Sequence, residues 1–286
     1  MEKLKQAIIS QAEASWVDLI GFAGRDRFDA PDSNSNPFSM FPEGRTVIMI
    51  GRRVTRGTLR GIEEGTNLSD YGMFGRSWLN DTFLSQSTFD LVHLIEKNGW
   101  EAMPVMPEKA GGKSGFTPDF DFAAVACGLA EIGLSGQVLT PRFGPRQRWH
   151  MIITNAPLAS DPLLIDPVCD QCGLCVDLCP LKALDKNRIE NRIICGKSMP
   201  VAFCDNALCQ NCANGVIGPA DPQGRPDRLA MFCSRTCIEH MNEAGTVQNH
   251  FRNAFRKRPA WRKDAEGRVM PALDASDAAA KPQRPD

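Results

Sequence analysis

Apolar and polar positions along the first half of the chain predict a module of mixed helices and strands. Leu4, Ile8 and Ile9 recur at helical spacing, which predicts a helix from Glu2 to Ala14. Thr46 to Ile50 is a short, partly β-branched apolar run before a glycine, as is typical of a buried strand. The same patterns predict strands at Trp16 to Ala23, Trp100 to Met106 and Trp149 to Thr154, and helices at Ser77 to Lys97 and Phe122 to Ile132. The elements together predict an α/β module over residues 1–160.

The most specific motif follows that module, in the run Cys169-Asp-Gln-Cys172-Gly-Leu-Cys175-Val-Asp-Leu-Cys179-Pro. Three cysteines two residues apart, then a fourth three further on before proline, form the ferredoxin pattern. Its first three thiolates bind one [4Fe–4S] cluster, and the fourth binds a second cluster where one is present. Zinc sites usually pair two Cys-x2-Cys knuckles, and disulfides within so tight a loop would be strained. The run therefore predicts at least one iron–sulfur cluster and a role in electron transfer.

The remaining cysteines leave two possibilities for a second centre. Ten of the eleven cysteines lie between Cys169 and Cys237, so there are enough thiolates for two [4Fe–4S] clusters, which need eight. The alternative is one cluster plus a structural zinc in place of the second, held by Cys209, Cys212, Cys233 and Cys237. Cys127, within an apolar stretch, is expected to be a small buried residue.

Composition places the chain among ordinary globular proteins, with 286 residues, 42% hydrophobic residues and a formal net charge of −1. No apolar run approaches the length of a membrane span, and the first ten residues carry no secretory signal pattern, so we expect no membrane partner. A reducing compartment would keep the cysteines available to iron. We therefore expect a cytoplasmic protein.

Three regions are expected along the chain. Residues 1–160 form the α/β cofactor and substrate module, 161–245 the iron–sulfur domain, and 246–286 a basic segment with a disordered tail from Ala265. The basic segment mixes arginines and lysines with aromatic residues, which is compatible with RNA binding but more typical of a solvated amphipathic helix.

The order of motifs resembles that of a known family. Five segments follow one another in the order found in epoxyqueuosine reductases and reductive dehalogenases. They are Leu91-Val-His-Leu-Ile-Glu-Lys-Asn-Gly99-Trp-Glu-Ala-Met-Pro104, Ala123-Ala-Val-Ala-Cys-Gly128-Leu-Ala-Glu-Ile-Gly133-Leu, Leu139-Thr-Pro-Arg-Phe-Gly144-Pro, Ile152-Ile-Thr154 and the cysteine run. The resemblance covers roughly residues 1 to 245. It implies an α+β fold, with a nitroreductase-like α/β module followed by a ferredoxin-like iron–sulfur domain. It also implies two [4Fe–4S] clusters that reduce a bound cobalamin, which then cleaves a carbon–oxygen or carbon–halogen bond.

The resemblance further implies a set of ligands. Family members place a lone cysteine about sixteen residues beyond the fourth ligand, and Cys195 lies at that distance from Cys179. The chain departs from the family in its last cysteines, where Cys233-Ser-Arg-Thr-Cys237 stands apart from Cys209-Gln-Asn-Cys212. The implied sets are Cys169, Cys172, Cys175 and Cys237 for the first cluster, and Cys179, Cys195, Cys209 and Cys212 for the second, with Cys204 and Cys233 unassigned.

Candidate catalytic residues also come from the resemblance. Epoxyqueuosine reductases use an aspartate ahead of the helix that here leads to Gly133, which points to Asp119 first and Asp121 second as proton donors. The alternative is that one of them simply caps that helix. Reductive dehalogenases use a tyrosine, and Tyr71 is the only one in the chain. The corrin is expected between the sheet and the helix near Phe122, with His150 as a cofactor neighbour.

Three functions follow as hypotheses. The first is a cobalamin-dependent iron–sulfur reductase that acts on a small molecule and takes electrons from a donor such as ferredoxin or flavodoxin. The second is an iron–sulfur electron-transfer or reactivating partner protein without its own corrinoid. The third is a non-catalytic binding module shaped by one cluster and a zinc. The tRNA-binding repeat domain of epoxyqueuosine reductases has no counterpart here, so we expect no nucleic-acid partner.

Overall fold

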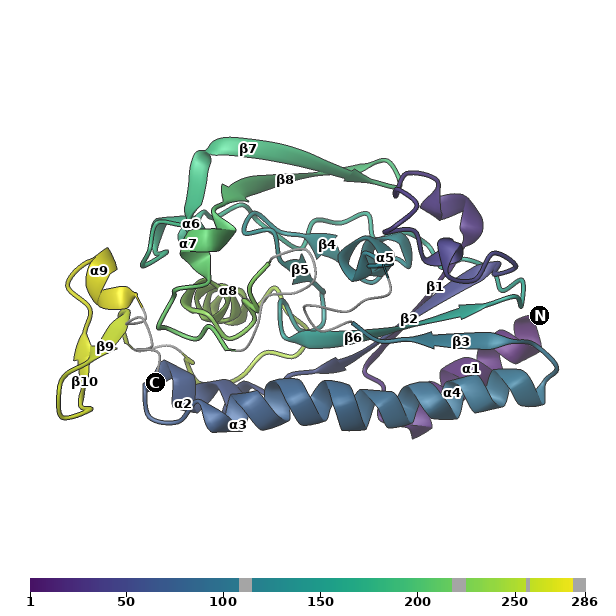
Figure 1. The fold of residues 1–286 in the computed structure, drawn as a ribbon, viewed down its shortest axis with the longest axis horizontal. Helices are drawn as coiled ribbons and strands as arrows, with labels where there is room; N and C mark the ends of the chain where they lie inside the picture. Colours follow the sequence, from purple (N-terminus) through teal and green to yellow (C-terminus); the bar gives the residue numbers. More distant parts are fainter. Residues whose placement is uncertain (108–114, 218–224, 256–257, 280–286) are drawn as a thin grey trace.

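A four-stranded antiparallel sheet lies at the centre of the protein (Figure 1). The computed structural model describes residues 1–107, 115–217, 225–255 and 258–279. The strands are β1 (Leu19–Gly24), β2 (Thr46–Arg53), β3 (Ala102–Val105), β4 (Glu131–Ile132), β5 (Val138–Leu139), β6 (Gln147–Thr154), β7 (Leu184–Ile194), β8 (Lys197–Cys204), β9 (Trp261–Lys263) and β10 (Val269–Pro271). The helices are α1 (Glu2–Ala14), α2 (Arg60–Glu63), α3 (Ser69–Gly72), α4 (Ser85–Lys97), α5 (Phe120–Ala126), α6 (Leu174–Asp177), α7 (Asn206–Cys209), α8 (Phe232–Glu243) and α9 (Ala275–Ala278). Short 3-10 helices lie at Arg25–Phe28, Pro37–Ser39 and Arg56–Leu59.

The central sheet has the strand order β1-β2-β6-β3 and is covered on both faces. Successive side chains of a strand point to opposite faces. Ile48 therefore packs on the side of α1 and α4, while Met49 packs on the side of α5. Because both faces are buried, β2 and β6 are apolar along most of their length. This explains why the sequence predicted them well.

A long helical rod runs along one face of the sheet (Figure 1). The sequence predicted one helix from Ser77 to Lys97, but regular α-helix begins only at Ser85. The turns before it, at Met73–Ser77 and Leu79–Leu84, have π-helical hydrogen bonding. Such wider turns usually occur as short insertions in α-helices.

Helix α5 covers the other face and is shorter than predicted. The sequence predicted a helix from Phe122 to Ile132, which is wrong beyond Ala126, since Glu131–Ile132 is strand β4. Gly128 ends the helix with a φ of +74°, and a Cβ there would lie 2.1 Å from the carbonyl oxygen of Pro162. Only glycine fits that turn. The chain then forms the small β4–β5 hairpin instead of continuing the helix.

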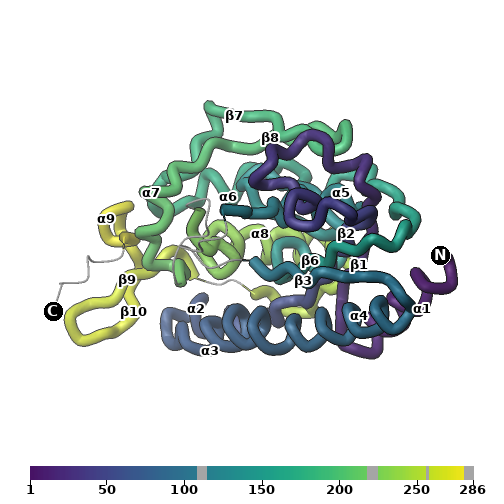
Figure 2. The backbone as a smooth tube through the Cα atoms, turned by 45° about the vertical axis from the view of Figure 1, so that its right-hand side comes forward, coloured from purple at the N-terminus to yellow at the C-terminus, as the bar shows by residue number. Residues whose placement is uncertain are grey.

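The cysteine-rich segment packs directly on this face. Its long hairpin β7–β8 lies over α5 in both views (Figures 1 and 2). Ile194 and Met199 from the hairpin are buried in the same apolar cluster as α5 and the sheet. The cysteine-rich segment is therefore built onto the core of the α/β module.

The C-terminal region is more ordered than the sequence predicted. Instead of a disordered tail from Ala265, β9 and β10 form a hairpin that leads to α9. Trp261 is buried and its ring nitrogen donates to the carbonyl oxygen of Ile62 at 2.9 Å. Residues 280–286, and Arg256 and Lys257 of the basic segment, lie outside the described residues. Within the described part of the chain, no helix has both the length and the apolarity needed to cross a membrane.

A fully buried ion pair connects α2 to α8. Arg235 Nε lies 2.6 Å from Glu63 Oε2, and both side chains are inaccessible to solvent. Arg235 also donates to the carbonyl oxygens of Asn214 and Ala230. The pair therefore fixes the helix that carries Cys233 and Cys237.

We predict that Glu63→Ala destabilises the protein by about 3–5 kcal/mol, because it leaves the Arg235 charge buried without its partner. Glu64→Ala is the matched control. Glu64 pairs with Arg258 at the surface, so its loss should cost about 1 kcal/mol or less. Thermal unfolding measures both variants. Equal effects would show that the buried pair contributes no more than the surface one.

Candidate iron–sulfur centre

The first three cysteines of the run converge with Cys237. The run turns through Gly173, which has a φ of +77°, into the short helix α6, which packs against α8. Burial raises the pKa of Cys237 well above its usual value, and charge on Cys175, Cys169 and Cys172 raises it further. Burial likewise raises the pKa of Cys175 to about 12. The structure thus brings together the four thiols that the sequence assigned to the first cluster.

Backbone contacts hold Cys169 in place at this group. The amide of Val168 donates to Glu131 Oε1 at 2.8 Å, and the amide of Cys169 donates to the same oxygen. The amide of Leu134, in the β4–β5 hairpin, points at Cys169 Sγ at 3.5 Å. Amide donors to a ligating sulfur are a common way in which proteins stabilise a reduced cluster. The α/β module therefore contributes directly to this site.

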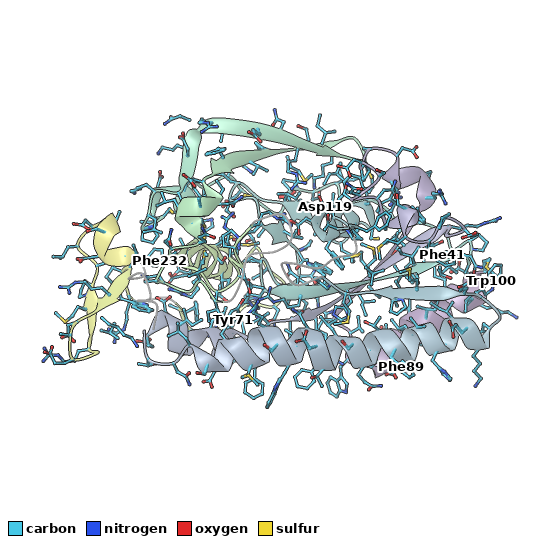
Figure 3. All side chains as sticks on the ribbon, in the orientation of Figure 1. Phe41, Tyr71, Phe89, Trp100, Asp119 and Phe232 are labelled. Atoms are coloured by element: carbon cyan, nitrogen blue, oxygen red, sulfur yellow. The ribbon has the colours of Figure 1, made fainter. Side chains whose placement is uncertain are left out.

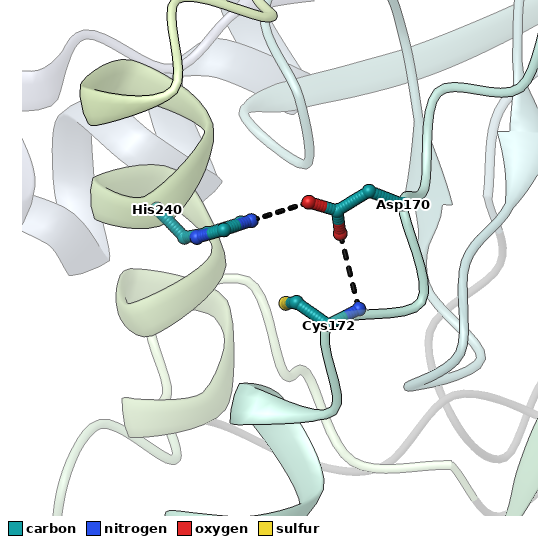
Figure 4. A group of neighbouring side chains, drawn as sticks. All are labelled: Asp170, Cys172 and His240. Atoms are coloured by element: carbon teal, nitrogen blue, oxygen red, sulfur yellow. Dashed lines mark hydrogen bonds and ion pairs between the residues drawn. The ribbon is translucent and has the colours of Figure 1, made fainter.

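His240 lies beside the first group (Figure 4). This position of His240 was not predicted from the sequence. Its Nε2 is 2.6 Å from Asp170 Oδ2, and Asp170 Oδ1 accepts from the amide of Cys172 at 3.1 Å. Burial works to raise the pKa of Asp170, but the hydrogen bonds from His240 and Cys172 lower it overall. The ligand atoms of Asp170, Cys172 and His240 lie within 4.8 Å of one another. The available signal was the position of His240 one helical turn after Cys237.

A second group of thiols lies deeper in the protein. Cys179, Cys209, Cys212 and Cys233 are all buried in one apolar cluster with α6. Burial raises the pKa of Cys212 to about 12, and charge on Cys233 and Cys179 adds to the effect. Cys204 is the fifth member. A hydrogen bond from the Cys209 thiol holds its pKa below the usual value.

Arg228 is the cation of this second group. Its Nη2 lies 4.0 Å from Cys233 Sγ. Burial works to lower the pKa of Arg228, but the negative charges of Cys233, Cys204 and Cys209 raise it above its usual value. Arg228 therefore remains charged among thiols that become anionic when they bind metal.

Cys195 is not brought to either group. It lies at the turn between β7 and β8, where its Sγ is 3.6 Å from the carbonyl oxygen of Arg27. It packs against the cluster around α5, and the nearby charges that act on it are Arg27 and Asp26. The structure therefore does not bring Cys195 to the second group of thiols, in which Cys233 lies instead. Cys127 is buried in the core, as the sequence predicted.

Asp119 and Asp121 lie together at the start of α5 (Figure 3 labels Asp119). Asp119 Oδ1 caps the helix by accepting from the amide of Phe122 at 2.9 Å, and its Oδ2 lies 3.2 Å from Arg192 of β7. Asp121 Oδ2 lies 2.7 Å from Arg225 Nη1. Burial raises the pKa of Asp121, and the neighbouring Asp119 charge adds to this rise against the opposing effect of Arg225. Asp119 thus caps the helix, which is the alternative role that the sequence left open. Asp119 and Asp121 also share a site with Arg192 and Arg225 of the cysteine-rich segment.

Tyr71 belongs to a different part of the molecule. It is fully buried, its hydroxyl accepts from Arg148 Nη2 at 2.5 Å, and it donates to Asp227 at 3.3 Å. Burial raises its pKa, as does the charge of Asp227, while Arg148 opposes the rise. Figure 3 shows Tyr71 near the rod of α3 and α4, away from Asp119. The structure therefore does not bring Tyr71 together with Asp119 and Asp121.

His150 lies inside the core on the opposite face of the sheet from α5. Its Nδ1 is 2.9 Å from the hydroxyl of Thr88 on α4, and its Nε2 is buried without a hydrogen-bond partner. Burial lowers the pKa of His150 to about 4, so the ring is neutral. His150 therefore does not lie on the face of the sheet that carries Phe122, where the cofactor was expected.

The space predicted for a corrin is also filled. Between the sheet and α5, Met49, Met151, Phe122 and Val125 pack in one buried cluster. A macrocycle there would have to displace the core that holds α5 to the sheet. The residues present do not fit a corrin at that position.

The comparisons with known proteins give one consistent relationship. No family model matches the chain. The chain is 28% identical over 210 residues to an epoxyqueuosine reductase of Staphylococcus aureus (strain NCTC 8325 / PS 47), covering 65% of this chain and 53% of the relative. It is 28% identical over 117 residues to a tetrachloroethene reductive dehalogenase of Desulfitobacterium hafniense, covering 40% of this chain and 19% of that one.

Solved structures of reductive dehalogenases cover nearly the whole chain. One of them is a reductive dehalogenase whose structure suggests a mechanism for B12-dependent dehalogenation, with a TM-score of 0.55 at 17% identity over 98% of this chain and 42% of the other. The mixed helix and sheet fold is thus similar to that of a reductive dehalogenase. The resemblance predicted from the sequence is confirmed: the chain is related to epoxyqueuosine reductases and reductive dehalogenases, which are oxidoreductases. It spans about half the length of the epoxyqueuosine reductase and less of the dehalogenases.

We predict that His150 makes stability depend on pH. The ring has a pKa of about 4 in the folded protein and about 6.5 when unfolded, so the unfolded chain binds the additional proton between these values. Stability is complete above pH 6.5 and falls by roughly 3 kcal/mol as the pH is lowered to 4. Unfolding measured across this range should show a shallower pH slope in His150→Gln than in the wild type. The exposed His93→Gln is the control, and parallel curves for all three proteins would contradict the prediction.

Proposed function

We propose that the protein is an iron–sulfur oxidoreductase that moves electrons through two adjacent clusters. The observation that carries this proposal is the arrangement of the thiols in two neighbouring groups that meet at α8. Cys169, Cys172, Cys175 and Cys237 would hold the first cluster, and Cys179, Cys209, Cys212 and Cys233 the second, with Cys204 beside it. When bound, two [4Fe–4S] clusters supply one-electron transfer.

The cysteines of the two groups suit cluster binding better than they suit the unbound thiol form. Burial raises the pKa of Cys175, Cys212 and Cys237, so these thiols resist ionisation in the absence of a cation. Iron supplies the positive charge that makes buried thiolates favourable, and it couples ligand binding to folding. The zinc alternative, with Cys209, Cys212, Cys233 and Cys237, is less well supported, because Cys237 lies with the first group.

The first cluster is the entry point for electrons in this proposal. Cys172 is exposed and Cys169 is half-buried, whereas all four ligands proposed for the second cluster are buried. A small reduced donor of the ferredoxin or flavodoxin class would reach the first cluster at the surface. The donor loses one electron and the protein gains it, without transfer of an atom.

The carboxylates at α5 suit a proton-transfer role in the reduction of a small-molecule substrate. Asp121 has a raised pKa and faces Arg225, so it holds a proton more readily than an ordinary carboxyl does. Asp119 stays engaged as the helix cap and as the partner of Arg192. We propose Asp121, ahead of Asp119 and Tyr71, as the proton donor of the site.

The proposal extends to fold and location. The sheet with α4 and α5 corresponds to the nitroreductase-like module, and residues 161–245 to the ferredoxin-like one. A cytoplasmic location is proposed from the free thiols, which need a reducing compartment. No nucleic-acid partner is proposed, because Arg56 and Arg146 hold the aromatic residues of the C-terminal basic segment by cation–π contacts.

A corrinoid-dependent reductase is the second candidate. It is favoured by the fold shared with a dehalogenase described as B12-dependent. The filled core near Phe122 requires any corrinoid to bind elsewhere than between the sheet and α5.

We predict that Cys233→Ser lowers the iron content from about eight to about four per chain, because one cluster loses a ligand while the other retains its four. Cys195→Ser is the matched control and should leave the iron content unchanged, because Cys195 lies apart from both groups. Iron and zinc analysis of anaerobically reconstituted protein measures both. Loss of zinc from Cys233→Ser with iron unchanged would instead establish the zinc alternative.

We predict for the corrinoid candidate that the protein binds cob(II)alamin with the cobalt in its base-off form. Electron paramagnetic resonance distinguishes base-off from base-on cobalt through nitrogen hyperfine splitting. Excess folded, cluster-loaded protein should convert the spectrum completely. A free-cofactor spectrum under these conditions would rule out this second candidate and leave electron transfer as the function.

A further inference from the structure

Arg228 occupies an unusual position beside the second group of cysteines. Its guanidinium lies between the group and the β4–β5 turn. Its Nη2 is 4.0 Å from Cys233 Sγ, and a Cβ added at Gly136 would lie 3.8 Å from its Nη1. Cys204 and Cys209 also lie within its electrostatic reach. One cation therefore faces three of the five thiols of this group.

No carboxylate compensates this cation among the residues that the structure describes. Asp227, its neighbour in the chain, is already engaged by Arg148 at 2.6 Å, by Arg76 at 3.5 Å and by the hydroxyl of Tyr71. The Nε of Arg228 is buried without a hydrogen-bond partner. The positive charge is therefore directed at the sulfurs.

The backbone on both sides of Arg228 is fixed. Asp227 anchors it on one side through Arg148 and Tyr71. On the other side, the carbonyl oxygen of Arg228 accepts from the amide of Met231 at 3.0 Å and from the hydroxyl of Ser234. A cation on such a segment keeps its distance from the sulfurs when their charge changes.

The first group has a different electrostatic environment. Its charged neighbours include Asp170, bonded to the amide of Cys172 and paired with His240, and Glu131, bonded to the amide of Cys169. Arg228 contributes there only as the weakest of the influences on Cys175. The two groups thus differ chiefly in the fixed cation at the second.

We infer that Arg228 raises the reduction potential of the second cluster and so directs electrons from the first cluster to the second. This inference rests on the proposed function. Reduction adds one negative charge to a cluster, and a fixed cation a few ångströms away stabilises the reduced state more than the oxidised state. An electron from the reduced donor would enter the first cluster, whose proposed ligand Cys172 is exposed, and would pass to the second, whose proposed ligands are buried. Arg228 acts as a positioning and tuning residue and touches no substrate.

The test is a redox titration of the cluster-loaded, full-length protein, monitored by electron paramagnetic resonance. Arg228→Gln removes the charge and nearly preserves the length of the side chain. It should shift the midpoint potential of one cluster downward and leave the other unchanged. Arg228→Lys keeps the charge and should restore most of the wild-type potential. Arg53 lies on β2 and pairs with Asp18. Arg53→Gln removes this distant cation, so it is the control and should shift neither potential.

The possible outcomes separate the inference from the proposed function. Unchanged potentials in Arg228→Gln, or equal shifts of both clusters, would overturn the inference while leaving two clusters in place. Loss of one cluster from both Arg228→Gln and Arg228→Lys would also overturn it, since the residue would then be a structural support. Wild-type protein with only four irons, or with zinc, would instead overturn the proposed function itself.

Discussion

The crowding of buried thiols around helix α8 is the constraint on which the rest of the structure depends. All the cysteines except Cys127 and Cys195 gather in two neighbouring groups at this helix. Buried thiols resist ionisation, and neighbouring thiolates repel one another. A group of buried thiolates is therefore stable only with compensating cations. Arg228 supplies one, and the bound metal would supply the others.

The remaining interactions position α8 relative to the α/β module. The buried pair of Glu63 and Arg235 fixes the helix to α2, and Arg148 holds Asp227 just before it. The hairpin β7–β8 adds a further attachment through Arg192 at Asp119. The α/β module therefore serves as a rigid frame for the cysteines, in addition to any substrate that it binds.

Local patterns in the sequence were enough to predict the central strands, α1 and the convergence of Cys169, Cys172 and Cys175. The strands β2 and β6 are buried on both faces and so read as continuous apolar runs, and the cysteine run encodes its own loop. Long-range features were not predictable in this way. Gly128 ends α5 because of a contact with Pro162, and Asp121 meets Arg225 across more than a hundred residues.

The ligand assignment shows the same limit. Spacing along the chain favoured Cys195, but the turn of the β7–β8 hairpin carries it to Arg27, away from the other thiols. Cys233 and Cys237 are one helical turn apart, and adjacent turns of α8 direct them to different groups. Their roles depend on where α8 lies, which spacing alone does not specify. Membership of a cluster is thus a property of the fold.

The position of Cys237 also has a consequence for biogenesis. Three ligands of the first group leave the ribosome well before α8 is made, so the nascent chain exposes an incomplete set of thiols during synthesis. Glu63 and Arg148, which hold α8 and Asp227, are made earlier still, so the receiving frame can fold before the last ligand arrives. The four thiols of the first group therefore come together only once α8 has docked on this frame.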